Sequence, residues 1–152
     1  MRLVIAAVGR SRRDATRELY EDYAGRLPWP VELKEIEERK PLPTAERIKR
    51  EGERLLAALP EGATMVALDG GGRELSSTAL AKTLGRWRDS GVRHIGFVIG
   101  GADGLDKALT GRADIVLSLG AMTWPHMLVR VMLAEQLYRA SAILTGHPYH
   151  RE

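Results

Sequence analysis

The fold class that this sequence predicts is an α/β domain with a mostly parallel sheet and helices on both faces. Short apolar runs alternate along the chain with longer segments whose apolar residues recur at the helical spacing. Most of these runs are continuous, as expected for strands buried on both faces. Three of them end in loops of small residues, at 69–72, 100–104 and 119–123. This alternation is typical of parallel α/β architectures.

The amino-terminal part of the chain predicts two strands around one helix. Residues 2–8 (RLVIAAV) form a continuous apolar run that predicts a buried strand. Asp14 is a suitable N-cap for the next helix, in which apolar residues recur every four positions until the segment Pro28-Trp29-Pro30 ends it. Residues 31–36 (VELKEI) alternate between apolar and charged side chains, which favours an edge strand.

The middle of the chain predicts two further helices around a strand. Thr44 is expected to cap a helix that runs to about Leu59, because its apolar positions follow the helical period. Residues 64–68 (TMVAL) predict a buried strand, closed by an aspartate and three glycines. Ser76 or Ser77 then caps the helix that follows.

The carboxyl-terminal third predicts two more strands and a long final helix. Residues 94–99 (HIGFVI) and 114–119 (DIVLSL) read as strands, with a short helix at 106–111 between them. Pro125 suits the first turn of the last helix, which is expected to run to about Ile143. This helix is apolar over more than one stripe, so it is either a core helix or one that also packs against a partner.

The length of 152 residues predicts a single domain over residues 1–152. The chain has no cysteine, which excludes disulfides, thiolate nucleophiles and thiolate metal sites. The apolar run at 3–8 is too short for the core of a signal peptide, and no apolar run has the length of a membrane helix. We therefore expect a cytoplasmic protein with no membrane association.

Basic residues occur in clusters, although the net charge of the chain is only +3. Such clusters either contact phosphates or form a solvated surface balanced by nearby carboxylates. The three clusters are Arg10, Arg12 and Arg13; Lys49, Arg50 and Arg54; and Arg86, Arg88 and Arg93.

The three small-residue loops are candidates for one shared pocket. In parallel α/β sheets, ligands bind beyond the carboxyl ends of the strands, and glycine there lets the backbone approach a ligand closely. No G-x-G-x-x-G follows the first strand and no G-x-x-x-x-G-K-[ST] occurs, so neither a standard dinucleotide site nor a P-loop is predicted.

The histidines do not predict a metal site, because no acidic cluster accompanies His147 and His150 in the short terminal tail. His126, next to the third loop, has either a structural or a chemical role. No Ser-His-Asp or paired-carboxylate pattern stands out. Any chemistry should therefore depend on positioning more than on a protein nucleophile, and methyl transfer from S-adenosylmethionine meets that condition.

Several segments together resemble a known family, the RlmH family of ribosomal RNA large-subunit (23S) pseudouridine N3-methyltransferases. The resemblance covers the whole chain, and the terminal motif is its most specific part. The matching segments are Leu68-Asp69, 99–105 (IGGADGL), 117–126 (LSLGAMTWPH), 129–140 (VRVMLAEQLYRA) and 146–152 (GHPYHRE).

The resemblance implies the SPOUT methyltransferase fold, an α/β sheet whose carboxyl-terminal part is threaded into a trefoil knot. Knots are rare exceptions to the rules of chain connection, and periodicity does not reveal them. The resemblance further implies a homodimer that uses S-adenosylmethionine to methylate N3 of a pseudouridine in 23S rRNA within the assembled 70S ribosome.

The resemblance also implies which residues form the site. The tail residues Tyr149, His150 and Arg151 would complete the active site or hold the RNA, across the dimer. We expect His150 or Tyr149 to deprotonate or orient the base, and Arg151 to hold phosphate or stabilise the developing negative charge. The cofactor contacts would fall on Leu68, Gly100, Leu119, Gly120, Ala121, Met122, Thr123 and Trp124.

The chain departs from the family pattern at a few positions. Ala102 and Asp103 stand where Pro and Glu are common, Trp124 where Leu is frequent, and Gly146 where Asn is common. Main-chain contacts should survive these changes. Two alternatives are a non-catalytic ribosome-binding factor with the same fold and a small-molecule nucleotide enzyme, neither of which needs this terminal motif.

Overall fold

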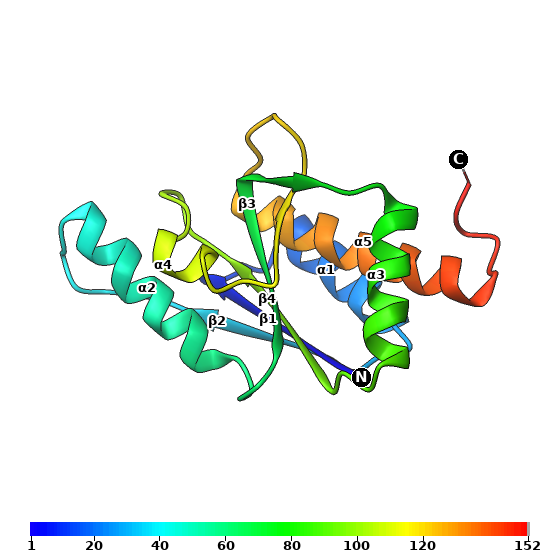
Figure 1. Cartoon of the computed structure of the whole chain (residues 1–152). Coiled ribbons are helices and arrows are strands. Elements are labelled where there is room, and N and C mark those ends of the chain that lie inside the picture. Colours follow the sequence, from blue (N-terminus) through cyan, green and yellow to red (C-terminus); the bar gives the residue numbers. More distant parts are fainter. Residues whose placement is uncertain (152) are drawn as a thin grey trace.

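The computed structural model describes residues 1–151 and contains one five-stranded sheet in the order β2-β1-β4-β3-β5. Every pairing between neighbouring strands is parallel, as predicted (Figure 1). The carboxyl ends of the strands therefore meet at one edge. The strands are β1 (Arg2–Val8), β2 (Val31–Ile36), β3 (Thr64–Glu74), β4 (His94–Ile99) and β5 (Ile115–Ser118).

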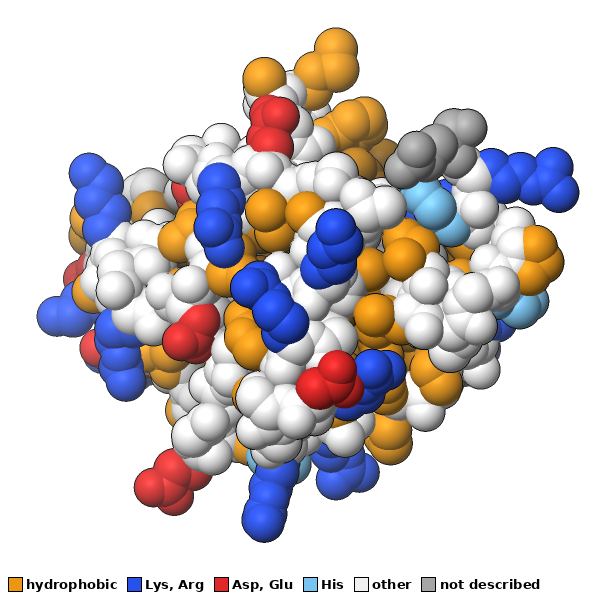
Figure 2. All heavy atoms as spheres, turned by 45° about the vertical axis from the view of Figure 1, so that its right-hand side comes forward, with side chains coloured by type: hydrophobic (Ala, Val, Ile, Leu, Met, Phe, Trp, Pro, Cys, Tyr) orange, Lys and Arg blue, Asp and Glu red, His pale blue; other side chains and the backbone are white. Residues whose placement is uncertain are grey.

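Helices cover both faces of the sheet (Figure 1). On one face α5 packs against both α1 and α3, and on the other α2 packs against α4. The side of the molecule that carries α3 has basic side chains over much of its centre (Figure 2). The helices are α1 (Ala15–Arg26), α2 (Thr44–Ala58), α3 (Ser77–Asp89), α4 (Lys107–Thr110) and α5 (His126–Thr145).

Alternation along the strands divides the core into two layers, one on each face. Leu3 and Ile5 of β1 belong to the larger layer, beneath α1, α3 and α5. Ala6, the residue after Ile5, points to the opposite face and belongs to the smaller layer with Leu55 of α2. Because successive side chains of a strand point to opposite faces, a strand covered on both sides must be apolar at every position.

Strand β3 is longer than predicted, and the glycine loop that was expected to close it is a bulge inside it. Leu68 and Arg73 both pair with Leu117 of β5, so residues 69–72 bulge out between them. A Cβ on Gly72 would lie 2.5 Å from the carbonyl oxygen of Val116, which explains why glycine is needed at this close approach.

Of the three helix caps that the sequence predicted, two are confirmed by the structure. The side chain of Asp14 accepts hydrogen bonds from the amides of Thr16 and Arg17, and Ser76 accepts one from Ala79. The prediction for Thr44 was wrong, because α2 begins at Thr44 itself and Pro43 occupies the cap position without a side-chain hydrogen bond.

The trefoil knot stays a prediction, because strand order and pairing register do not determine how the chain is threaded.

Within residues 1–151, no helix combines the length and the apolar character needed to cross a membrane.

An ion pair buried in α5 holds the start of the basic loop after β1. The Arg130 side chain is 3% exposed, and its Nη1 lies 2.6 Å from Oε2 of Glu35. Its Nη2 donates to the carbonyl oxygens of Val8, at 3.1 Å, and Gly9, at 2.8 Å. Glu35 also accepts a hydrogen bond from the amide of Ser11, so Arg130 and Glu35 together determine where the loop leaves the sheet.

Replacing Arg130 by methionine is expected to lower the free energy of unfolding by about 3 kcal/mol, because Glu35 and two carbonyl groups lose a buried partner. Burial alone would raise the pKa of Glu35, but hydrogen bonds from Arg130 and Ser11 outweigh it and hold the pKa below its ordinary value of 4.5. The stability from ionised Glu35 is therefore present above pH 4.5 and lost as the pH falls through the lower folded-state pKa.

Denaturant unfolding of wild type and Arg130→Met from pH 3 to 7 measures both effects. The variant should be less stable at pH 7 and should lose less stability than wild type on acidification. Equal stability of the two proteins at pH 7 would contradict the assignment. Arg17→Met is the matched control, because Arg17 forms an exposed ion pair on α1 and such pairs contribute about 1 kcal/mol or less.

Candidate cofactor site

A cavity of about 310 Å³ lies at the carboxyl edge of the sheet, between the bulge of β3 and the ends of β4 and β5. It is formed by the three small-residue loops that the sequence singled out. Every residue predicted to contact the cofactor lines it: Leu68, Gly100, Leu119, Gly120, Ala121, Met122, Thr123 and Trp124. The structure thus brings together in one cavity residues that are far apart in the sequence.

The loop after β4 is a tight turn with no room for a side chain at its start. The amide of Gly104 donates to the carbonyl oxygen of Gly101 at 3.1 Å, and these two residues form an isolated β-bridge. Gly104 has a φ of 84°, which favours glycine. A Cβ on Gly100 would lie 2.7 Å from the carbonyl oxygen of Gly104, so the turn requires glycine at position 100.

The loop after β5 forms the opposite wall and is held by its own hydrogen bonds. The amide of Gly120 donates to Oγ of Ser118 at 3.2 Å, and this hydroxyl donates to the carbonyl oxygen of Gly120 at 3.1 Å. The indole of Trp124 donates to the carbonyl oxygen of Leu119 at 3.3 Å. Met122 and Trp124 are 75% and 40% exposed. They form an apolar rim that a bound ligand would cover.

The chemistry of the cavity suits a ligand with an apolar or aromatic body held by main-chain groups. Leu68, Ile99 and Val129 are among the apolar side chains of its walls. Asp69 is the carboxylate among its lining residues, and its Oδ2 accepts a hydrogen bond from the amide of Gly71 at 2.8 Å. Glycine-rich turns leave amides and carbonyls open to the ligand. An adenosine group carrying an amino-acid chain fits such a site.

The terminal tail packs against the chain's own helices, away from this cavity. The hydroxyl of Tyr149 donates to Oε1 of Glu135 at 3.0 Å and lies 3.4 Å from the hydroxyl of Tyr23. The Tyr149 ring meets that of Tyr138 edge to face, with centroids 4.7 Å apart, and the guanidinium of Arg139 lies 4.8 Å from its centroid. These contacts give the tail a defined position on α5.

The other two predicted tail residues lie beside Tyr149. Nδ1 of His150 is 3.4 Å from Nη1 of Arg139, and the side chain of Arg151 is exposed. Tyr149, His150 and Arg151 are all absent from the lining of the cofactor cavity. Within one chain, the structure therefore does not bring the predicted catalytic residues to the predicted cofactor residues.

Burial raises the pKa of Tyr149 above its ordinary value, and its hydrogen bonds to Tyr23 and Glu135 raise it further. In this arrangement Tyr149 keeps its proton at neutral pH. It is suited to donating a hydrogen bond and not to removing a proton from a base.

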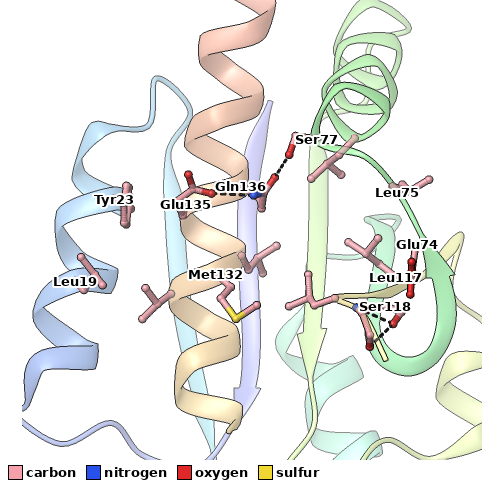
Figure 3. A pocket seen from close by; sticks show the side chains of 15 residues that line it. Leu19, Tyr23, Glu74, Leu75, Ser77, Leu117, Ser118, Met132, Glu135 and Gln136 are labelled. Atoms are coloured by element: carbon pink, nitrogen blue, oxygen red, sulfur yellow. Dashed lines mark hydrogen bonds between the residues drawn. The ribbon is translucent and has the colours of Figure 1, made fainter. Parts of the chain in front are cut away.

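A second cavity, of about 530 Å³, separates the tail from the cofactor cavity. Figure 3 shows it lying across α5, with Leu19 and Tyr23 of α1 on one side and Leu75 and Ser77 on the other. Ser77 donates a hydrogen bond of 2.7 Å to Gln136 across this cavity. The two cavities share Leu117, Leu119 and Gly120 as lining residues. The cavity beside the tail therefore adjoins the candidate cofactor site directly.

The sequence predictions of site residues missed several positions. Ile99, Leu117 and Val129 line the cofactor cavity, and Ile99 could have been found as the last apolar residue of its predicted strand. Glu135 and Arg139 hold the tail, and their spacing of four residues on a helix was the available signal. His126 lines the cavity as well, next to Gly9.

Among the described residues, no group of three or more His, Asp or Glu side chains is arranged to hold a metal.

Comparisons with known proteins agree over nearly the whole chain. The family described as "Predicted SPOUT methyltransferase" matches residues 1–150. The "Ribosomal RNA large subunit methyltransferase H" of Rhodospirillum centenum is 58% identical over 151 residues, covering 99% of both chains. The protein of the same name from Paramagnetospirillum magneticum is 56% identical over 151 residues, again covering 99% of each.

Among solved structures, the SpoU methyltransferase AviRb from Streptomyces viridochromogenes, in complex with the cofactor AdoMet, is a more distant neighbour. It aligns with a TM-score of 0.47 and 10% identity, covering 94% of this chain and 61% of that one. A likeness at this level carries no argument for a substrate or a residue role.

Proposed function

This chain belongs to the SPOUT methyltransferase family, and on that basis we propose that it transfers a methyl group from S-adenosylmethionine to N3 of a pseudouridine in 23S rRNA of the assembled ribosome. Methylation of large-subunit ribosomal RNA is the activity for which the relatives are named. The cavity in which all the predicted cofactor residues meet is the observation that carries the proposal. A non-catalytic ribosome-binding factor would not need it.

The residues of the cavity would bind and orient the cofactor through main-chain groups. The turn at 100–104 and the loop at 119–124 present their backbone to it, and Met122 and Trp124 would shield it from water. When bound, S-adenosylmethionine supplies an electrophilic methyl group whose leaving group is a neutral thioether. The protein must then align donor and acceptor and exclude water from the site.

The acceptor nitrogen must lose its proton, and the tail is suited to assist this. We assign the removal of the proton to His150, because the raised pKa of Tyr149 leaves that phenol protonated. Tyr149 would orient the base as a hydrogen-bond donor. Arg151, which is exposed, would hold a phosphate or stabilise the negative charge that develops on the base.

A homodimer would bring the tail to a cofactor cavity. Leu19 of α1 and Leu128 of α5 are 45% and 37% exposed, and Met132 lies one turn beyond Leu128 on α5. Exposed apolar side chains on neighbouring helices favour contact with a second copy. Because the tail does not line its own chain's cofactor cavity, we propose that it serves the cavity of the partner. An enzyme acting on assembled ribosomes would work in the cytoplasm.

Methyl transfer from labelled S-adenosylmethionine tests the proposed function. Purified protein is offered 70S ribosomes, free 50S subunits and naked 23S rRNA, all from a strain that lacks the modification. We expect label on one pseudouridine of the assembled ribosome, with N3 identified by mass spectrometry of the nucleosides. Cofactor binding without label on any substrate would refute the proposal and favour a binding factor or another acceptor.

A further inference from the structure

A shallow groove of about 540 Å³ runs along α3, on the surface between the end of β3 and the end of α5. Its middle is lined by small or uncharged residues, including Ala79, Thr83 and Gly85 of α3. A Cβ on Gly85 would lie 2.9 Å from Cδ2 of Leu144, so glycine allows α3 to approach α5 closely at this point. The groove is therefore a product of tight helix packing.

The rim of this groove is strongly basic. Arg73, Lys82, Arg86 and Arg88 line it and are exposed, and Asp89 is the carboxylate among the lining residues. Arg88 is paired with Asp89 at 2.9 Å. Within residues 1–151, the other three cations form no ion pair. Figure 2 views this side of the molecule and shows basic side chains over its centre with few acidic ones among them.

Two of these cations are placed so that they repel each other. Lys82 and Arg86 are four residues apart on α3 and therefore lie on the same face of the helix. Like charges at this spacing destabilise an isolated helix. Nη2 of Arg86 lies 3.4 Å from Oγ1 of Thr83, which leaves its other donors open to solvent. A bound polyanion would turn the repulsion into attraction, because both cations could then contact negative charges.

The groove is connected to the candidate cofactor site. Leu75 lines both the groove and the second cavity, and Leu117, Leu119 and Gly120 line both the second cavity and the cofactor cavity. Three adjoining concave surfaces thus extend from the candidate cofactor site to the basic rim of the groove. The groove lies over α3, away from Leu19 and Leu128, which we assign to the contact with a second copy.

We propose that this basic groove binds the phosphate backbone of ribosomal RNA next to the acceptor nucleotide. The inference rests on the proposed function, because it deepens the account of the RNA substrate. Exposed, unpaired cations along an uncharged groove suit phosphates, which need positive charge more than shape. Contacts of this kind position the RNA without reading its sequence.

The test compares two double variants that remove the same charge. Lys82→Gln with Arg86→Gln neutralises the groove, and Lys49→Gln with Arg50→Gln neutralises two exposed cations of α2, on the other face of the sheet. Ribosome binding and methyl transfer are measured between 50 and 300 mM salt. Log affinity falls as log salt rises, and each lost phosphate contact makes this slope shallower by about 0.7–0.9.

For the groove variant we expect a KM for ribosomes at least about 10-fold higher and a salt slope smaller by about 1–2. The kcat and the Kd for S-adenosylmethionine should not change, because none of these residues lines the cofactor cavity. The α2 variant should match wild type. A variant that exchanges the two cations, Lys82→Arg with Arg86→Lys, should keep the KM of wild type, because phosphate binding needs the positive charge.

Three results would overturn the inference. The first is a groove variant whose KM and salt slope match wild type, and the second is an equal loss in the α2 variant. The third is weaker binding to ribosomes with unchanged binding to protein-free rRNA, which would assign the groove to an acidic protein surface. Failure of wild type to methylate any substrate would refute the proposed function instead, and the binding measurements would still decide on the groove.

Discussion

Gly100→Ala is expected to abolish binding of S-adenosylmethionine while the chain remains folded. The added Cβ would lie 2.7 Å from the carbonyl oxygen of Gly104 and 2.8 Å from its carbonyl carbon, and both are backbone atoms. The turn at 100–104 must therefore shift, and it forms one wall of the cofactor cavity. We expect the Kd measured by calorimetry to rise at least about 100-fold, which corresponds to about 2.7 kcal/mol.

The control for this variant is Gly25→Ala, because the same methyl group on α1 would meet no atom within 4 Å. It should bind the cofactor like wild type. Circular dichroism and thermal unfolding establish that Gly100→Ala is folded, since overpacking costs about 1–3 kcal/mol. A folded Gly100→Ala protein with the Kd of wild type would show that this turn does not form the cofactor site.

Deleting residues 149–152 is expected to abolish methyl transfer and to leave cofactor binding intact. The described tail residues are absent from the lining of the cofactor cavity, whereas the proposed proton transfer depends on them. The rate of transfer should fall by a factor of about 10²–10⁴ or more, the usual contribution of a positioned acid or base. Single-turnover transfer to ribosomes, together with calorimetry of cofactor binding, measures both parts. Wild-type transfer by the truncated protein would contradict the role of the tail.

Tyr149→Phe is the companion to the truncation, because it retains the ring that packs against Tyr138 and removes the hydroxyl that donates to Glu135. The tail of this variant should keep its position, so any loss of activity measures the contribution of the Tyr149 hydroxyl.

Co-expression of the truncated chain with Gly100→Ala tests whether the tail acts on a partner. Mixed dimers would contain one cavity and one tail that both function, so part of the activity should return. An inactive mixture would place the tail's action within one chain.

Most of the small-residue loops' arrangement follows from local sequence. Their positions followed from continuous apolar strands, and their meeting point followed from the parallel sheet, since the carboxyl ends of parallel strands share an edge. The structure places all three loops around one cavity, although residues 69–72 form a bulge inside β3 and not the end of that strand. The bulge at 69–72 was not predictable, because it depends on both Leu68 and Arg73 pairing with Leu117.

The helix caps show the same division. Asp14 and Ser76 were predictable, because a side-chain oxygen near a helix start satisfies amides only two or three residues away. Thr44 was predicted wrongly because Pro43 stands before it and takes the cap position, which made Thr44 the first residue of the helix. Local chemistry thus predicts an element better than its boundary.

By itself, the sequence determined the strand and helix order, the edge of the sheet at which the candidate cofactor cavity lies, and the family to which the terminal motif belongs. These depend on spacing and residue type within short segments. Only the tertiary structure decided that Arg130 pairs with Glu35, 95 residues away, that the tail lies apart from its own cofactor cavity, and that Arg73 joins the cations of α3 along one groove. The physical reason is that such contacts form between distant segments, and the packing of helices on the sheet determines which of those segments meet.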